Sequence, residues 1–153
     1  MIESYKQAIE EFKRVDHLYY VTLKYTRTVD VIRSVIDRLI STFEYGIAAL
    51  LLVMKEEKQI DEIPANPVGK GTLAKEKCRD KEMCKYMDEY LRLRKIMRCE
   101  YTKREEFRRH VTMIVDFEGQ TINIDIDKLK EYYDDTRDFL TYLKKRVEPY
   151  KDE

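Results

Sequence analysis

The fold is decided by residues 28–54, which read TVDVIRSVIDRLISTFEYGIAALLLVM. Apolar side chains recur in this stretch every three or four positions, the spacing that places them on one face of an α-helix. Thr28 is a suitable N-cap, and Asp30 in the first turn favours the positive end of the helix dipole. The apolar stripe widens after Ile47, so we expect the second half of this helix to be buried on most sides. The apolar positions are Ile32, Val35, Ile36, Leu39, Ile40, Phe43, Ile47, Leu50, Leu51 and Met54.

The same spacing predicts three more helices, at about residues 3–25, 81–107 and 127–148. About residues 60–72 hold two of the three prolines and two of the four glycines, so this segment is predicted to be the main internal loop. A short helix can precede the one at 81–107. Pro149 is expected to end the last helix, because proline cannot continue the helical hydrogen-bond pattern.

Between the third and fourth predicted helices, over residues 111–126, apolar side chains alternate with a period of two. This alternation predicts two strands, and Glu118–Gly119 suits the two-residue loop of a β-hairpin. The pairing places one apolar face on the protein and His110 opposite Asp127, which is expected to cap the last helix. The predicted pairs are Phe117 with Gln120, Val115 with Ile122, Met113 with Ile124 and Val111 with Ile126.

Composition agrees with a single folded domain over residues 1–153. The chain has 43% hydrophobic and 39% charged residues, which is typical of a packed core under a heavily charged surface. Only 4 glycines and 3 prolines interrupt it, which favours long helices over many short strands. The predicted fold is mainly α: a long-helix bundle with a small β-hairpin inserted at about 110–126, before the C-terminal helix. Abundant Lys, Glu and Arg with few Asn and Gln are typical of a thermophile protein.

The cysteines and the N-terminus favour a cytoplasmic protein. Cys78, Cys84 and Cys99 match neither a zinc site nor a disulfide framework, so we expect reduced thiols. Residues 1–6 lack the basic and apolar regions of a signal peptide. The most apolar run, residues 47–54, is too short to span a bilayer, so no membrane association is expected.

No cofactor and no metal are expected. The chain has no nucleotide-binding loop and no serine elbow, and its two histidines, His17 and His110, are far apart in the sequence. Its carboxylates alternate with Lys and Arg, which is typical of solvated helical faces.

One stretch is locally basic, although 30 basic and 30 acidic residues make the whole chain neutral. Residues 92–110 hold eight Lys and Arg against three Glu. Arginine forks suit phosphate, and aromatic rings at Tyr90, Tyr101 and Phe107 can stack on bases. The alternative is that the arginine stems cover the helix and pair with acids on neighbouring elements. The candidate phosphate or nucleic-acid ligands are Arg92, Arg98, Lys103, Arg108 and Arg109.

Within this stretch, residues 104–110 read REEFRRH. They resemble the signature of the HEPN superfamily, an Arg followed by a polar residue, a short spacer and a His, with Glu105 where the family prefers Asn, Asp or His. The resemblance implies a helical, dimerising domain, and in many members a metal-independent ribonuclease. It implies catalytic roles for Arg104, which would stabilise charge on the phosphate, and His110, which would move the proton. Residues 101–113 are also similar to uncharacterised archaeal proteins.

Each candidate has a structural alternative. His110 can instead anchor the hairpin by bonding Asp127. Residues 24–28, KYTRT, place basic and hydroxyl groups before a helix, which suits a phosphate. The same residues can equally form an interhelical turn with an N-cap.

Two classes of function stay open at this point. One is a HEPN-like RNA-binding domain or metal-independent ribonuclease. The other is a non-catalytic helical interaction or regulatory module, such as a toxin–antitoxin component with a protein partner. The wide apolar stripe after Ile47 also predicts a homodimer through the long helices.

Overall fold

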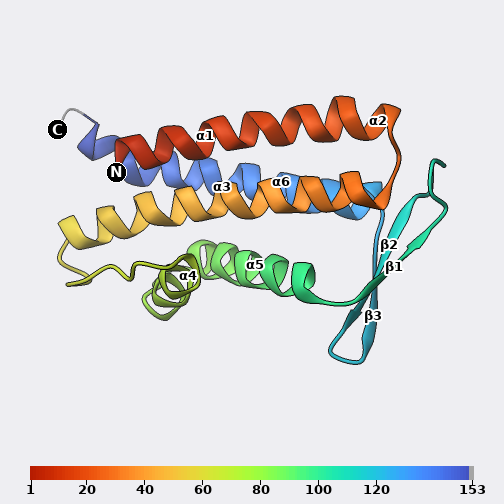
Figure 1. Cartoon of the computed structure of the whole chain (residues 1–153). Coiled ribbons are helices and arrows are strands. Elements are labelled where there is room, and N and C mark those ends of the chain that lie inside the picture. The colour runs from red at the N-terminus through yellow and green to blue at the C-terminus, as the bar shows by residue number, and fades with distance from the viewer. Residues whose placement is uncertain (152–153) are drawn as a thin grey trace.

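The computed structural model describes residues 1–151, as a helical bundle with a small sheet at one end (Figure 1). Three long helices lie along one another: α1 (Ile2–His17), α3 (Val29–Glu56) and α6 (Ile126–Val147). A fourth helix, α5 (Lys81–Arg98), packs against α3 and α6. The predicted fold class, mainly α with a small antiparallel β element before the last helix, is confirmed.

The first helix extends as far as the sequence predicts. After α1 the chain continues through a π-helical turn (Leu18–Thr22) into α2 (Leu23–Tyr25). Tyr19 in the π-helical turn donates a hydrogen bond to the carbonyl of Ile126, and its ring stacks on Tyr133. These contacts hold this end of the first helix against α6.

Helix α3 is the centre of the core. Its N-cap is Thr28, whose hydroxyl accepts a hydrogen bond from the amide of Val31 at 3.2 Å, as predicted. The helix packs against α1, α4, α5 and α6, and its second half is buried within the chain, from Ile47 to Met54. The wide apolar stripe is thus covered by the chain's own helices, so it gives no reason to expect a dimer.

The segment predicted as the main loop is partly helical. α4 (Pro67–Glu76) begins inside it, because Pro67 suits the first helical position and Asn66 caps the helix. Asn66 accepts a hydrogen bond from the amide of Gly69. The short helix expected before residue 81 is therefore confirmed, and it starts earlier than the loop prediction allows.

Three antiparallel strands form the sheet, in the order β1 (Tyr101–Arg104), β2 (Thr112–Phe117) and β3 (Gln120–Ile124). The predicted pairs of Phe117 with Gln120, Val115 with Ile122 and Met113 with Ile124 are confirmed. Glu118 and Gly119 both have positive φ, at 52° and 82°, as a two-residue hairpin loop requires.

The sheet also corrects the helix predicted at 81–107. Helix α5 ends at Arg98, and Cys99 is already extended, with φ −79° and ψ 156°. Residues 101–104 pair with β2 instead of continuing the helix. A hairpin alone is marginally stable, and this third strand covers one of its edges.

The pairing predicted at the open end of the hairpin, away from its loop, is also wrong. β3 ends at Ile124, so Val111 and Ile126 do not form a pair in the ladder. Asp125 rather than Asp127 is the N-cap of α6, and its carboxylate accepts a hydrogen bond from the amide of Lys128 at 2.8 Å. The N-cap of α6 therefore lies two residues before Asp127, the residue predicted to cap the helix opposite His110.

The expectation of three reduced thiols is wrong for two of them. Cys78 and Cys84 form a disulfide between the end of α4 and the first turn of α5, with their Cα atoms 5.4 Å apart, while Cys99 is free. The turn between the two helices brings together cysteines whose spacing matches no common framework. Among the described residues, no helix is both long and apolar enough to cross a membrane.

Candidate functional site

The HEPN-like motif lies on a strand and the loop that follows it. Arg104 is the last residue of β1 and pairs with Thr112, the first residue of β2. Residues 105–111 form the loop between these strands, and His110 lies two residues before Thr112. The two predicted catalytic residues therefore lie at the two ends of one loop, and both are exposed.

Two residues with left-handed backbone shape this loop. Glu105 and Phe107 have φ of 55° and 65°, a region that costs a non-glycine residue roughly 1 kcal/mol or more. Two turn hydrogen bonds accompany them, from the amide of Arg108 to the carbonyl of Glu105 and from Val111 to Arg108, both at 3.1 Å. Phe107 faces solvent, with 75% of its surface exposed.

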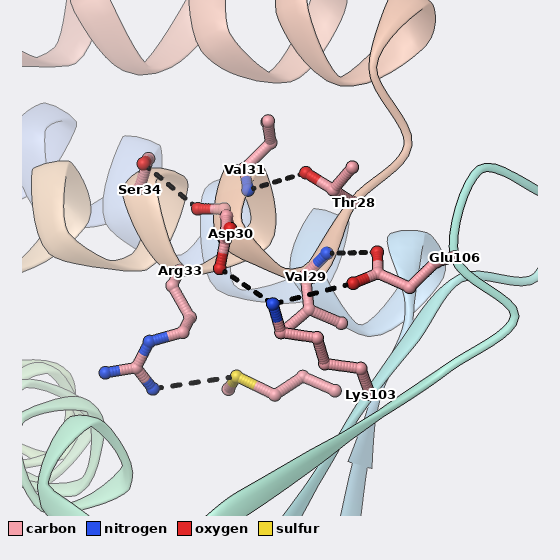
Figure 2. Close-up of polar contacts among 9 residues, drawn as sticks. Thr28, Val29, Asp30, Val31, Arg33, Ser34, Lys103 and Glu106 are labelled. Atoms are coloured by element: carbon pink, nitrogen blue, oxygen red, sulfur yellow. Dashed lines mark hydrogen bonds and ion pairs between the residues drawn. The ribbon is translucent and has the colours of Figure 1, made fainter.

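The loop is bound to the beginning of α3 (Figure 2). The Glu106 carboxylate accepts a hydrogen bond from the amide of Val29, the first residue of α3, at 3.0 Å. The amide of Phe107 donates to the carbonyl of Arg27 at 2.7 Å. Residues 105–111 and the turn before α3 consequently form one continuous end of the molecule.

Lys103, on β1, pairs with acids of both the loop and the beginning of α3. Its ammonium nitrogen lies 3.3 Å from a carboxylate oxygen of Asp30 and 3.7 Å from one of Glu106 (Figure 2). The pKa of Lys103 is raised, chiefly by its hydrogen bond to Asp30. Lys103 thus pairs with two acids of the protein itself, and its side chain is 43% exposed.

The second candidate, residues 24–28, is the interhelical turn of the alternative interpretation. The Thr28 hydroxyl accepts a hydrogen bond from the amide of Val31, and the Glu106 carboxylate accepts one from the amide of Val29. Two of the amides that would bind a phosphate at the start of α3, those of Val29 and Val31, therefore already have an oxygen partner within the chain.

The predicted basic patch is divided in two. On α5, Arg92 lies over the ring of Phe117 at 5.1 Å, and Arg94 and Lys95 pair with Glu44 and Glu118. Arg98 is exposed, but the five residues 99–103 separate it from Arg104, and the six steps of extended chain span about 20 Å. The other half of the patch lies around the 105–111 loop.

Around the loop, Arg104, Arg108 and Arg109 are all exposed, and none forms an ion pair with any residue in the range 1–151. Only the backbone carbonyl of His110 is bound, by the hydroxyl of Thr112 at 2.8 Å. The His110 ring has no hydrogen bond to Asp127, so the anchoring role considered for it is not found in the described chain.

Exposed aromatic rings lie on this loop and on the segment that is hydrogen-bonded to it. Tyr25 at the end of α2 is 80% exposed and lies two residues before Arg27, whose carbonyl binds the loop. Of the rings predicted to stack on bases, Phe107 is available, Tyr90 is buried, and Tyr101 is partly covered by Arg33. Tyr25 lies within the second candidate segment, residues 24–28, for which the sequence predicts phosphate contacts and no stacking ring. We call the following residues the loop-end surface: Tyr25, Arg104, Phe107, Arg108, Arg109 and His110.

A second polar cluster, which the sequence does not reveal, lies where α5 meets α6. Glu89 faces Asp135 beside a surface hollow of about 530 Å³, and one Glu89 carboxylate oxygen is buried without a hydrogen-bond partner in the described structure. Burial and the neighbouring Asp135 raise the pKa of Glu89 to about 7, while Arg92 and Lys128 oppose this rise. The Glu89 carboxyl therefore gains and loses its proton near neutral pH.

No family model matches this chain, and no curated protein or solved structure is significantly similar to it. The HEPN resemblance accordingly stays a prediction that rests on the motif.

Proposed function

We propose that this protein is a HEPN-like RNA-binding domain that contacts RNA through the loop-end surface. The observation that supports this most strongly is the gathering of three arginines without acid partners beside two strongly exposed aromatic rings. Elsewhere in the basic stretch the cations of α5 and β1 mostly contact acids or rings of the protein itself.

The chemistry of this surface suits a single strand. Guanidinium groups bind phosphates through paired hydrogen bonds, and exposed rings stack on unpaired bases whatever their sequence. Phe107 and Tyr25 present such rings on two adjoining segments, the loop and the end of α2. A single-stranded RNA therefore fits this surface better than a duplex, whose bases are stacked internally.

We further propose that the surface cleaves the RNA without a metal. The exposed His110 ring would take the proton of the attacking 2′-hydroxyl or supply one to the leaving oxygen. Arg104, at the other end of the same loop, would stabilise the charge that grows on the phosphate. Both side chains are free for these roles because neither is held by another residue of the described chain.

A non-catalytic interaction module is the second candidate. It is favoured by the position of the motif on a strand and a loop, since the resemblance implies a helical setting. The two candidates share the loop-end surface and differ in whether RNA or a protein covers it.

The RNA proposal is tested by fluorescence anisotropy with a labelled oligouridylate. Replacing both Arg108 and Arg109 by Ala should weaken binding by about tenfold or more and reduce its salt dependence, because two phosphate contacts and their released counterions are lost. Replacing Lys144 and Lys145, two exposed cations at the other end of the molecule, is the matched control and should change little. Equal effects of the two double variants, or no binding by the wild type, would contradict RNA binding at this surface.

The resemblance also implies a homodimer, which we retain as part of the proposal. The buried stripe of α3 cannot form its interface. Tyr20 and Val21, which are 50% and 43% exposed, are neighbouring exposed apolar side chains near the end of the first helix, and we assign the interface to them.

A further inference from the structure

The conformation of the 105–111 loop depends on contacts from outside it. Glu105 and Phe107, on either side of Glu106, both have left-handed backbone. Such residues persist only where the surrounding structure holds them. The two reversals turn Phe107 toward solvent, while the Glu106 carboxylate reaches the start of α3 (Figure 2).

Glu106 supplies the side-chain contact that ties the loop to the bundle. The Glu106 side chain is less than a third exposed, and its carboxylate accepts a hydrogen bond from the amide of Val29, which has no acceptor within α3. Thr28 satisfies a different amide of the same helix end, that of Val31. The negative charge of Glu106 also lies at the positive end of a 28-residue helix, where it is favoured.

We propose that Glu106 is a positioning residue for RNA binding: its contact with α3 holds the 105–111 loop in the conformation that presents Arg104, Arg108, Arg109 and His110 together. This inference rests on the proposed function for its consequence, RNA binding, but not for the contact itself. Lys103 supports the arrangement by bridging Glu106 to Asp30. Released from α3, the loop would lose the hydrogen bond from Phe107 to Arg27 as well, and its cations would separate.

Charge alone makes the opposite prediction, which is what makes the proposal testable. Removing any acid beside a cationic surface should strengthen the binding of an anion. Glu105 is the control, because it is the neighbouring acid and is exposed with no ion pair to any residue of the described range. Glu105→Ala and Glu106→Ala remove the same charge from adjacent positions, and only the second removes the contact with α3.

The experiment measures hydrogen exchange of the backbone amides and oligouridylate binding on the full-length protein. In Glu106→Ala the amides of Val29 and Phe107 should exchange about tenfold faster or more, as expected for loss of a hydrogen bond to a charged group, and oligouridylate should bind about tenfold more weakly. Glu105→Ala should leave both amides protected and bind slightly more tightly. Glu106→Gln keeps an acceptor oxygen and should restore most of the protection and binding. Exchange in α6 should be unchanged in all three variants.

The exchange and binding measurements test different parts of the proposal. Unchanged exchange in Glu106→Ala would overturn the proposal, whatever the RNA does. Faster exchange with undiminished binding would also overturn it, because Glu106 would then only cap the helix. If the wild type binds no oligouridylate, the proposed function fails, and the exchange measurements alone still decide whether Glu106 holds the loop.

Discussion

At the residue scale, His110 is the side chain whose removal distinguishes the two candidate functions. If the protein cleaves RNA as proposed, His110→Ala should slow cleavage by about a hundredfold or more, because the proton-transfer group is lost. Binding should be largely retained, whereas Arg104→Ala should weaken both steps. Cleavage should also persist in a chelator, since no metal takes part in the proposed mechanism.

The matched control is His17→Ala, which removes the other histidine, an exposed residue at the end of α1. A gel assay of labelled RNA gives the rates. Cleavage that survives in His110→Ala would rule out the proposed catalytic role and leave the interaction module as the better description.

A second prediction at this scale concerns the proton of the Glu89 carboxyl. The pKa of Glu89 is about 7 in the folded protein, above its ordinary value of 4.5, so the folded state holds the proton more tightly than the unfolded chain. Stability should therefore fall as the pH rises from about 4.5 to about 7. Glu89 is partly exposed, so we expect it to account for about 2 kcal/mol of this fall.

Glu89→Gln keeps the shape of the protonated carboxyl and cannot ionise. It should be more stable than the wild type at pH 8 and similar to it at pH 4, as measured by urea unfolding across this range. Asp88→Asn, at the neighbouring position and paired with Lys75 on the surface, is the control. If wild type and Glu89→Gln lose stability in parallel, Glu89 does not carry the proton.

At the scale of elements, the disulfide joins two helices that otherwise meet at a short turn. Cys78 follows α4, and Cys84 lies in the first turn of α5, which Asp80 caps by accepting the amide of Met83 at 2.6 Å. Closing so short a loop lowers the conformational entropy of the unfolded chain, which stabilises the folded state by about 2 kcal/mol. Reduction, or replacement of both cysteines by Ser, should therefore lower the melting temperature by several degrees.

Cys99→Ser is the control, because Cys99 is free and forms no bridge. It should leave the melting temperature nearly unchanged. Alkylation followed by mass spectrometry should find one reactive thiol in the unreduced wild type and three after reduction. Three reactive thiols before reduction would show that the bridge does not form in solution.

At the scale of the whole molecule, the open question is assembly. We expect light scattering to give about twice the monomer mass of 18.6 kDa. Tyr20→Glu with Val21→Glu should shift the protein to monomer, because a charge at an apolar contact is costly to bury. Tyr45→Glu, which changes an exposed ring on α3, should leave the dimer intact. A wild-type monomer at micromolar concentration would exclude the homodimer.

Much of the helical core could be predicted because it depends on local periodicity. The stripe of α3 from Ile32 to Met54 is buried as its spacing requires, and Thr28 caps the helix as its side chain allows. The hairpin register from Met113 to Ile124 follows from alternation and the Glu118–Gly119 loop. Each of these features is specified by residues close together in the chain.

The end of α5 and the start of α6 could not be predicted in the same way. Residues 99–107 continue a helical spacing, and nothing local shows that β2 offers them a strand edge. Asp125 and Asp127 are chemically the same cap, and only the length of β3 decides between them. Cys78 and Cys84 likewise pair because the turn between α4 and α5 brings them together.

The same difference between local sequence and long-range packing applies to the candidate site. The sequence by itself determined which side chains of the candidate site carry positive charge, Arg104, Arg108 and Arg109, and which one is an imidazole, His110, since this chemistry belongs to the side chains. Only the tertiary structure decided that Arg92 and Lys103 are engaged elsewhere and that Glu106 binds the start of α3, a contact between residues 77 positions apart. Local spacing specifies the face of a helix or strand, whereas contacts across the chain depend on how whole elements pack, which no short stretch of sequence contains.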